Sequence, residues 1–206
     1  MAFNYDKVFV KTEIERIIRK NSPGTQKFFR NAASARLIGY KNNLLEEYED
    51  SSITKEIRGG PTAENESGTL DENGNLFSFI GFDSDAGNPA EEFADYLDGR
   101  ITLENTGKYY SDGQGTRIEF NVLAPTKEEI ESAFPMPWEP GSWVFKVSEG
   151  ISGLGEYIFH KFLPKPPSRS TTGLQMKYEV REGEFRPQPY FSKMFKKFLD
   201  KIRKKN

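Results

Sequence analysis

The most regular pattern in the chain is a run of apolar residues spaced three or four positions apart in its first quarter. This spacing places the side chains on one face of an α-helix. It predicts a long amphipathic helix over residues 26–48, with Thr25 available to cap its first turn after a breaking segment at 21–24. The apolar positions are Phe29, Ala33, Leu37, Tyr40, Leu44 and Tyr48.

Four further segments carry helical signals. The chain closes with an aromatic stripe at helical spacing from about Tyr190, and a shorter helix is expected over 12–20. Asn88 followed by Pro89 is typical of a helix start, because Asn caps and proline suits the first helical position. Residues 126–129 form a capping box that opens a short helix.

Strands are predicted where apolar and polar residues alternate, because successive side chains of a strand point to opposite faces of the sheet. A dense apolar run short enough for a buried strand is a further candidate. Segment 143–147 is expected to pair as a hairpin with 157–162, across a glycine-rich turn. The predicted strands are 76–82, 101–110, 116–123, 143–147, 157–162 and 174–180.

These elements predict an α+β fold. We expect a mixed, mostly antiparallel sheet of at least four strands, with the long N-terminal amphipathic helix packed on it and a C-terminal amphipathic helix. At 206 residues the chain suits a single structural domain, 1–206. Outside its core we expect an N-terminal arm (1–24), long loops (59–75 and 163–173) and a basic C-terminal helix (190–206).

Composition narrows the class of protein. Hydrophobic residues make up only 35% of the chain, but 17 Phe, 9 Tyr and 2 Trp supply enough bulk for a modest core. The net charge is -2, which gives the whole molecule no strong electrostatic preference. There is no cysteine, which excludes disulfides and thiolate metal sites. Without a signal-like or membrane-spanning apolar run, we expect a soluble protein made in a cytoplasm.

Few residues in the chain are candidates for a catalytic, metal or cofactor site. The single histidine, His160, lies in an alternating run, and neighbouring Ser152 lacks a nucleophile-elbow motif. The glycine-rich segment 150–155 fails the dinucleotide and P-loop spacings. Residues 83–87 resemble a calcium loop, but Ala94 falls where the bidentate acid is needed. We therefore predict no catalytic, metal or cofactor site, and a protein that is not an enzyme.

Two segments are candidates for contact with another subunit or with DNA. In the C-terminal helix, cations surround the aromatic stripe. This pattern is typical of a docked amphipathic helix, of a contact with phosphates or an acidic partner, or of a membrane-surface helix. The candidate residues of the C-terminal helix are Lys193, Lys196, Lys197, Lys201, Arg203 and Lys204.

An acidic cluster lies at residues 46–50, at the end of the predicted long helix. It is either a solvated face or a patch that contacts a partner.

The second segment is the loop 163–173. It has no apolar side chain after Leu163 to anchor it, and its three prolines lower the entropy lost on ordering. Long loops without secondary structure are usually functional or disordered. We expect this loop to project from the domain and to contact an adjacent subunit or the path of the DNA through Lys165, Arg169 and Ser170.

Two stretches carry a resemblance to a known group of proteins. The first comprises Ile53–Ile57, Gly59–Pro61, Ser67–Leu70 and Gly74–Phe82, and the second comprises Pro137–Trp143, Gly150–Gly155, Ser168–Ser170 and Gly173–Gln175. Together they resemble virion structural proteins of tailed bacteriophages, of the neck or tail-completion group (head–tail joining, tail terminator-like). The resemblance covers roughly half of the chain, and it departs from the pattern at Leu163–Pro167.

This resemblance implies a function in assembly. It implies a homo-oligomeric ring, often six-fold, at the junction between the connector and the tail tube of a virion, with DNA passing through its lumen. The implied partners are other copies of the chain and adjacent connector or tail-tube proteins, with no membrane and no cofactor. The alternative is a nucleic-acid-binding module that uses the basic helix, against which stands a sequence pI of about 5.7. A hydrolase relying on carboxylates is a third, weaker hypothesis.

Overall fold

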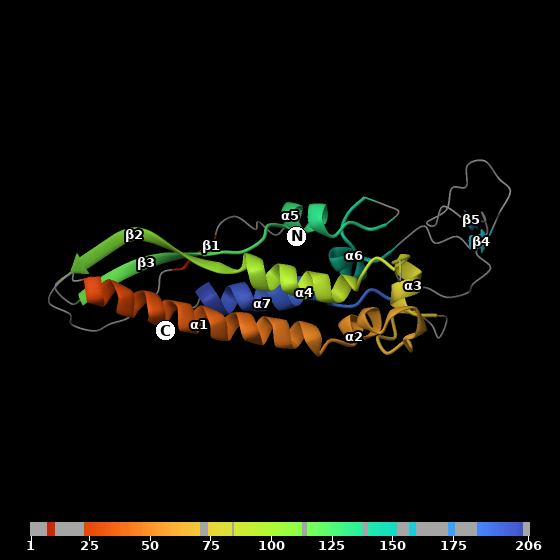
Figure 1. Ribbon diagram of the computed structural model, residues 1–206, viewed down its shortest axis with the longest axis horizontal. Helices are drawn as coiled ribbons and strands as arrows, with labels where there is room; N and C mark the ends of the chain where they lie inside the picture. Colours follow the sequence, from red (N-terminus) through yellow and green to blue (C-terminus); the bar gives the residue numbers. More distant parts are fainter. Residues whose placement is uncertain are drawn as a thin grey trace. The chain divides into compact units, whose positions relative to one another are not determined.

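The structure is a computed structural model in which residues 8–10, 23–70, 74–83, 85–112, 115–137, 140–151, 157–159, 173–175 and 185–203 are described. The fold is α+β and dominated by helices (Figure 1). The chain divides into two compact units, which are discontinuous in sequence. The first contains Met1–Glu47, Ala94–Lys127 and Met194–Asn206, and the second contains Tyr48–Phe93 and Glu128–Lys193.

The three longest helices confirm the helical patterns read from the sequence. The predicted helix 26–48 is α1 (Pro23–Glu49), and its expected apolar face is buried except for half-buried Tyr40. Helix α4 (Pro89–Arg100) starts at the expected proline, and α7 (Phe191–Arg203) carries the expected aromatic stripe. Asn88 caps α4, because its Oδ1 accepts from Ala90 N at 3.1 Å.

The first unit contains a three-stranded antiparallel sheet of β1 (Val8–Val10), β2 (Thr102–Asp112) and β3 (Gly115–Leu123), in the order β1-β3-β2 (Figure 1). The register of β2 and β3 shifts between Asn105 and Tyr109. Phe29 and Ala33 of α1 form a buried cluster with Phe120 of β3, so the long helix packs on the sheet as predicted.

Strand β1 was not expected. It lies inside the predicted N-terminal arm, yet it pairs along the full length of its three residues with β3, from Val8 opposite Val122 to Val10 opposite Phe120. The predicted helix 12–20 lies outside the described residues. Part of the arm is therefore an edge strand of the sheet.

Two of the predicted strands are wrong, because both segments are helices. The apolar run 76–82 contains α3 (Leu76–Ile80), and segment 143–147 belongs to α6 (Trp143–Glu149). The residues that cap these two segments explain why they form helices and not strands. Asn75 accepts from Ser78 N at 2.9 Å, and Gly81 ends α3 with a φ of 87°, a left-handed conformation that glycine adopts without strain. Ser142 caps α6 in the same way.

The predicted hairpin between 143–147 and 157–162 is consequently wrong as well. Strand β4 (Tyr157–Phe159) pairs instead with β5 (Gly173–Gln175), in a separate two-stranded antiparallel sheet. The sheets are thus smaller than the four-stranded one expected. Three short helices complete the described elements: α2 (Ser52–Arg58), the 3-10 helix η1 (Gly60–Thr62) and α5 (Lys127–Ala133), of which only α5 was predicted.

Aromatic rings form the core of the second unit. Phe93 lies at its centre, with ring centroids 4.8 Å from Phe191, 5.0 Å from Phe134 and 5.5 Å from Tyr48. These pairs are edge-to-face, the geometry that aromatic quadrupoles favour. Trp143 is 1% exposed and contacts Phe93 in the same manner. This cluster explains how a chain of modest apolar content builds a core.

Candidate functional site

The predicted basic helix is a docked amphipathic helix in the structure. In α7, Phe191, Phe195, Phe198 and Ile202 are buried, whereas most of its cations are exposed. The half-buried cation is Lys201, and the exposed ones are Lys193, Lys196, Lys197 and Arg203. Lys204 lies outside the described residues, as do Lys165, Arg169 and Ser170 of the loop 163–173.

The acidic cluster at the end of α1 is not an open patch of charge. Lys197 Nζ lies 2.7 Å from Glu47 Oε2, which joins the cluster to α7 within the first unit. In the second unit Glu49 pairs with Arg58, and Asp50 lies 3.6 Å from Lys55. Such exposed pairs contribute at most about 1 kcal/mol each, so they orient side chains more than they stabilise the fold.

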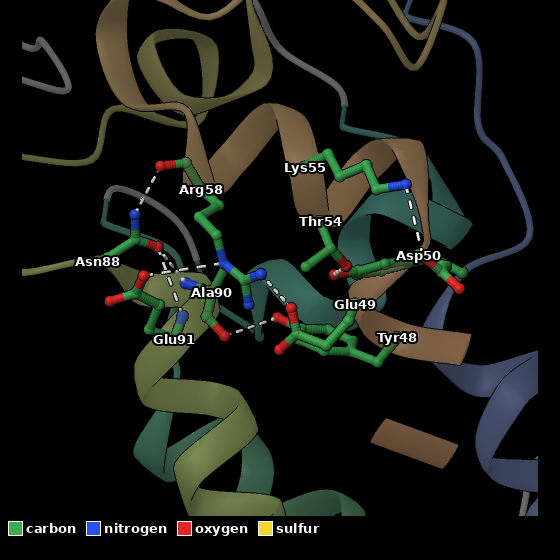
Figure 2. A network of polar contacts seen from close by, with 10 residues as sticks. Tyr48, Glu49, Asp50, Thr54, Lys55, Arg58, Asn88, Ala90 and Glu91 are labelled. Carbon is green, nitrogen blue, oxygen red and sulfur yellow. Dashed lines mark hydrogen bonds and ion pairs between the residues drawn. The ribbon is translucent and has the colours of Figure 1, made fainter. Parts of the chain in front are cut away.

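The second unit contains a buried polar network between the end of α1, α2 and the start of α4 (Figure 2). The Tyr48 hydroxyl donates to Ala90 O at 3.1 Å, where α4 begins. The Thr54 Oγ1 of α2 shares a hydrogen bond of 2.8 Å with the Tyr190 hydroxyl. Tyr48, Thr54 and Tyr190 are each 0% exposed, so these hydroxyl groups are paired away from water.

Burial shifts both tyrosines in the same direction. Loss of solvation raises the pKa of Tyr48 well above its usual range, although the hydrogen bond with Tyr190 acts in the opposite direction. Desolvation also raises the pKa of Tyr190. Both side chains therefore remain neutral hydrogen-bonding groups through the physiological range. A neutral, enclosed phenol serves as a structural donor and not as a nucleophile.

Half-buried Arg58 borders this network (Figure 2). Its guanidinium pairs with Glu49, the main reason that the pKa of Arg58 is raised, and its Nε lies 3.8 Å from Glu91 Oε1. Asn88 Nδ2 donates to Arg58 O at 2.8 Å. One arginine thus joins the end of α1, the end of α2 and the first turn of α4.

A buried carboxylate organises the neighbouring loop. Glu56 of α2 is 1% exposed, and its two oxygens accept from two backbone amides: Ser67 N at 2.9 Å and Leu76 N at 2.7 Å. Asn75 reinforces this arrangement, because its Nδ2 donates to Pro61 O at 2.8 Å. The predicted loop 59–75 is therefore tied down at both ends in its described part.

The remaining sequence candidates lie either outside the described residues or in a local turn. His160 and Ser152 lie outside the described residues. In the rejected calcium segment, exposed Asp83 accepts from Asp85 N at 3.0 Å in a local turn. Over the described ranges, no group of three His, Cys, Asp or Glu side chains is arranged to hold a metal ion.

Sequence reasoning missed the polar network and the Glu56 clamp. Thr54 and Tyr190 are 136 positions apart, and no local periodicity connects such residues. The detectable signal was weaker: Thr54 and Glu56 are polar residues between Ile53 and Ile57, on a short helix that is buried over most of its length.

Comparisons of the chain with known proteins found no relative. No protein-family model, no curated protein and no solved structure matches it. Among the helices that the structure describes, none is long and apolar enough to cross a membrane.

Proposed function

We propose that this protein is a non-enzymatic virion structural protein of a tailed bacteriophage, which forms a ring at the neck or tail junction as a tail-completion or terminator protein. The proposal rests on the resemblance of the two stretches described above. In this proposal the protein assembles with itself as a hexamer, the symmetry that the resemblance most often implies, and contacts connector or tail-tube proteins.

One structural observation supports a structural function over a reactive one. The first stretch of the resemblance supplies the polar groups that hold the second unit together: Thr54 bonds to Tyr190, and Glu56 bonds to the amides of Ser67 and Leu76. These groups face one another and the backbone, and they are buried. Residues used in this way give a rigid body on which loops can be presented to neighbouring subunits.

The first test is the state of assembly. Size-exclusion chromatography with light scattering, followed by negative-stain electron microscopy, should show a closed ring with a central lumen. The purified chain should reach the mass of six copies of the 23.6 kDa chain, about 142 kDa. A monomer at every concentration, and also in the presence of phage connector proteins, would contradict the proposal.

The second test addresses the loop 163–173. Deleting Lys165 to Thr172 and bridging the gap with two glycines should leave the circular dichroism spectrum unchanged but prevent ring formation, because the proposed subunit contacts are lost. His160→Ala and Ser152→Ala are the matched controls, and each should assemble as the parent chain does. A normal yield of rings from the deletion variant would show that the loop makes no contact needed for ring formation.

The alternative function is nucleic-acid binding through α7. The observation that favours it is the exposure of Lys193, Lys196, Lys197 and Arg203 along one helix. If phosphates bind there, replacing Lys196 and Arg203 with glutamine should weaken binding to duplex DNA and lower the slope of log affinity against log salt by about 1 per lost contact. Lys55→Gln on α2 is the control, and fluorescence anisotropy across a salt series is the measurement.

A further inference from the structure

Helix α1 carries a second apolar stripe on the face opposite its core. The two large hydrophobic side chains that stand out as exposed in the described structure are Phe28 at 58% and Ile38 at 52%, and both lie on this helix. They belong to a series at alternating spacings of three and four, the spacing of a coiled-coil seam. The series, here called the outer stripe, is Phe28, Asn31, Ala35, Ile38, Asn42 and Leu45.

The first five members of the outer stripe are exposed and Leu45 is half-buried, whereas Phe29, Leu37 and Leu44 on the opposite face are buried. Gly39 beside it is also exposed, and a Cβ added there would meet no atom of the chain within 4 Å. This helix of 27 residues therefore buries one face in the core of its own chain and leaves apolar side chains uncovered on the other face.

We propose that the outer stripe of α1 is a docking surface for the same stripe of a second copy of this chain, with the two helices antiparallel. The pattern is self-complementary about the point midway between Arg36 and Leu37. Opposed copies then place Phe28 against Leu45, Asn31 against Asn42, and Ala35 against Ile38. Large apolar residues meet each other at the ends, amides meet amides, and the small Ala35 makes room for Ile38.

Charge selects the antiparallel direction. The first half of α1 carries the exposed cations Lys27 and Arg30, and its last turns carry exposed Glu46, which the antiparallel register sets opposite Lys27. Glu47 and Glu49 are already paired within the chain, with Lys197 and Arg58. A parallel pair would set like charges at the same level, and Ala35 would face Ala35 across an unfilled layer. Antiparallel pairing sets the basic end of each helix against the acidic end of the other, and it opposes the helix dipoles.

The sizes of the residues that flank the outer stripe also fit the antiparallel register. Ser34 and Gly39 are equally distant from the midpoint of the stripe, so an antiparallel pair sets Ser34 of one copy at the level of Gly39 of the other. Both residues are small, and small residues let two helix backbones approach closely. The proposed contact therefore meets no bulky side chain at this level.

This contact goes beyond the proposed function. It is isologous, so it joins two copies by a two-fold axis, whereas a ring is built from heterologous contacts. The ring could fail while the pair persists, or the reverse. The two proposals therefore fail separately.

The first experiment is sedimentation velocity over a concentration series. The parent chain should show reversible pairing, and Ile38→Glu should raise the dissociation constant by at least about tenfold, because it places a carboxylate at the centre of the seam. Asn43→Glu adds the same charge to an exposed position of α1 outside the stripe, and it should change the constant by less than about twofold. Circular dichroism confirms that both variants are folded. An unchanged constant for Ile38→Glu, or a parent chain without any concentration-dependent association, would overturn the proposal.

The second experiment tests direction and register. The chain has no cysteine, so engineered pairs form disulfides without background. The double variant Asn31→Cys/Asn42→Cys should form a cross-linked dimer on mild oxidation. Neither single variant should form this dimer. In the antiparallel pair, residue 31 of one copy lies about 16 Å along the axis from residue 31 of the other, and the same holds for residue 42, so both pairs are beyond disulfide reach. Rapid cross-linking of the single variants would indicate a parallel pair and would refute the proposed register.

Discussion

At the scale of single residues, the second unit depends on buried side chains that hydrogen-bond to one another or to the backbone, as Tyr48, Thr54, Glu56 and Tyr190 do. Glu56 accepts from two backbone amides that lie 11 and 20 positions away along the chain, so a single carboxylate ties Ser67 and Leu76 to α2. Removing a partner from a buried amide costs more than the bond contributes, because the amide cannot return to water. Such groups are where substitutions should have their largest effect.

Glu56→Ala is therefore expected to lower the free energy of unfolding by about 2–6 kcal/mol, since two buried N–H groups lose their acceptors at about 1–3 kcal/mol each. Lys55→Ala, at the exposed neighbouring position, should stay within about 0.5 kcal/mol of the parent. Urea unfolding followed by circular dichroism measures both. Equal midpoints for the two variants would show that the clamp contributes nothing.

The two buried tyrosines predict how stability changes at high pH. Burial holds the pKa of Tyr48 and Tyr190 above the ordinary value near 10, so their neutral form is favoured in the folded state. The stability they contribute is complete below about pH 10 and is lost as the pH rises from there toward the folded pKa. Each group should lower the free energy of unfolding by about 1.4 kcal/mol per pH unit in that window.

Urea midpoints between about pH 8 and pH 11 will measure this slope. Tyr190→Phe should lower stability at neutral pH, because Thr54 loses its partner, yet the variant should show a shallower loss above about pH 10. The same slope in the parent and the variant would mean that Tyr190 ionises with little cost in the folded state.

At the scale of elements, sequence patterns predicted long elements well and short ones poorly. Helices α1 and α7 repeat their apolar positions over many turns, and β3 alternates across nine residues, so in each case the period is unambiguous. Helices α3 and α6 span five and seven residues, too few for periodicity to separate a buried helix from a buried strand. There, Asn75 and Ser142 as N-caps decided the outcome.

Two glycines test this view of the helices. Gly81→Ala should destabilise the protein by about 1 kcal/mol, since alanine must adopt the left-handed conformation that ends α3. Gly39→Ala lies inside α1 in open space, and it should stabilise the folded chain by up to about 1 kcal/mol. Thermal unfolding of the two variants should move in opposite directions. A gain in stability for Gly81→Ala would contradict the assignment of the α3 C-cap.

At the scale of the whole molecule, four described helices contribute residues to both compact units. The boundary falls within α1 after Glu47, within α4 before Ala94, within α5 after Lys127 and within α7 before Met194. Breaking a helix at such a point would sacrifice backbone hydrogen bonds on both sides. Long-range pairs within a unit, such as Glu47 with Lys197, leave no trace in local sequence patterns.

We therefore expect the two units to unfold together. In a Trp138→Phe background the fluorescence of buried Trp143 reports on the second unit, whereas circular dichroism reports on the helices of both units. The two signals should give coincident transitions in urea, as two-state behaviour requires. Two separated midpoints would show that the shared helices do not couple the units.

The sequence order of the first unit also has a consequence during synthesis. Its N-terminal segment ends at Glu47, but its last segment begins only at Met194. At a translation rate of about 5–20 residues per second, roughly 7–30 s pass between the two. Strand β3, on which Phe29 and Ala33 of α1 pack, is made within that interval, but α7 with its buried aromatic stripe is still missing from the unit. The emerging protein should therefore depend on chaperones that bind exposed hydrophobic surface near the ribosome, and a stall before Met194 should leave an aggregation-prone fragment.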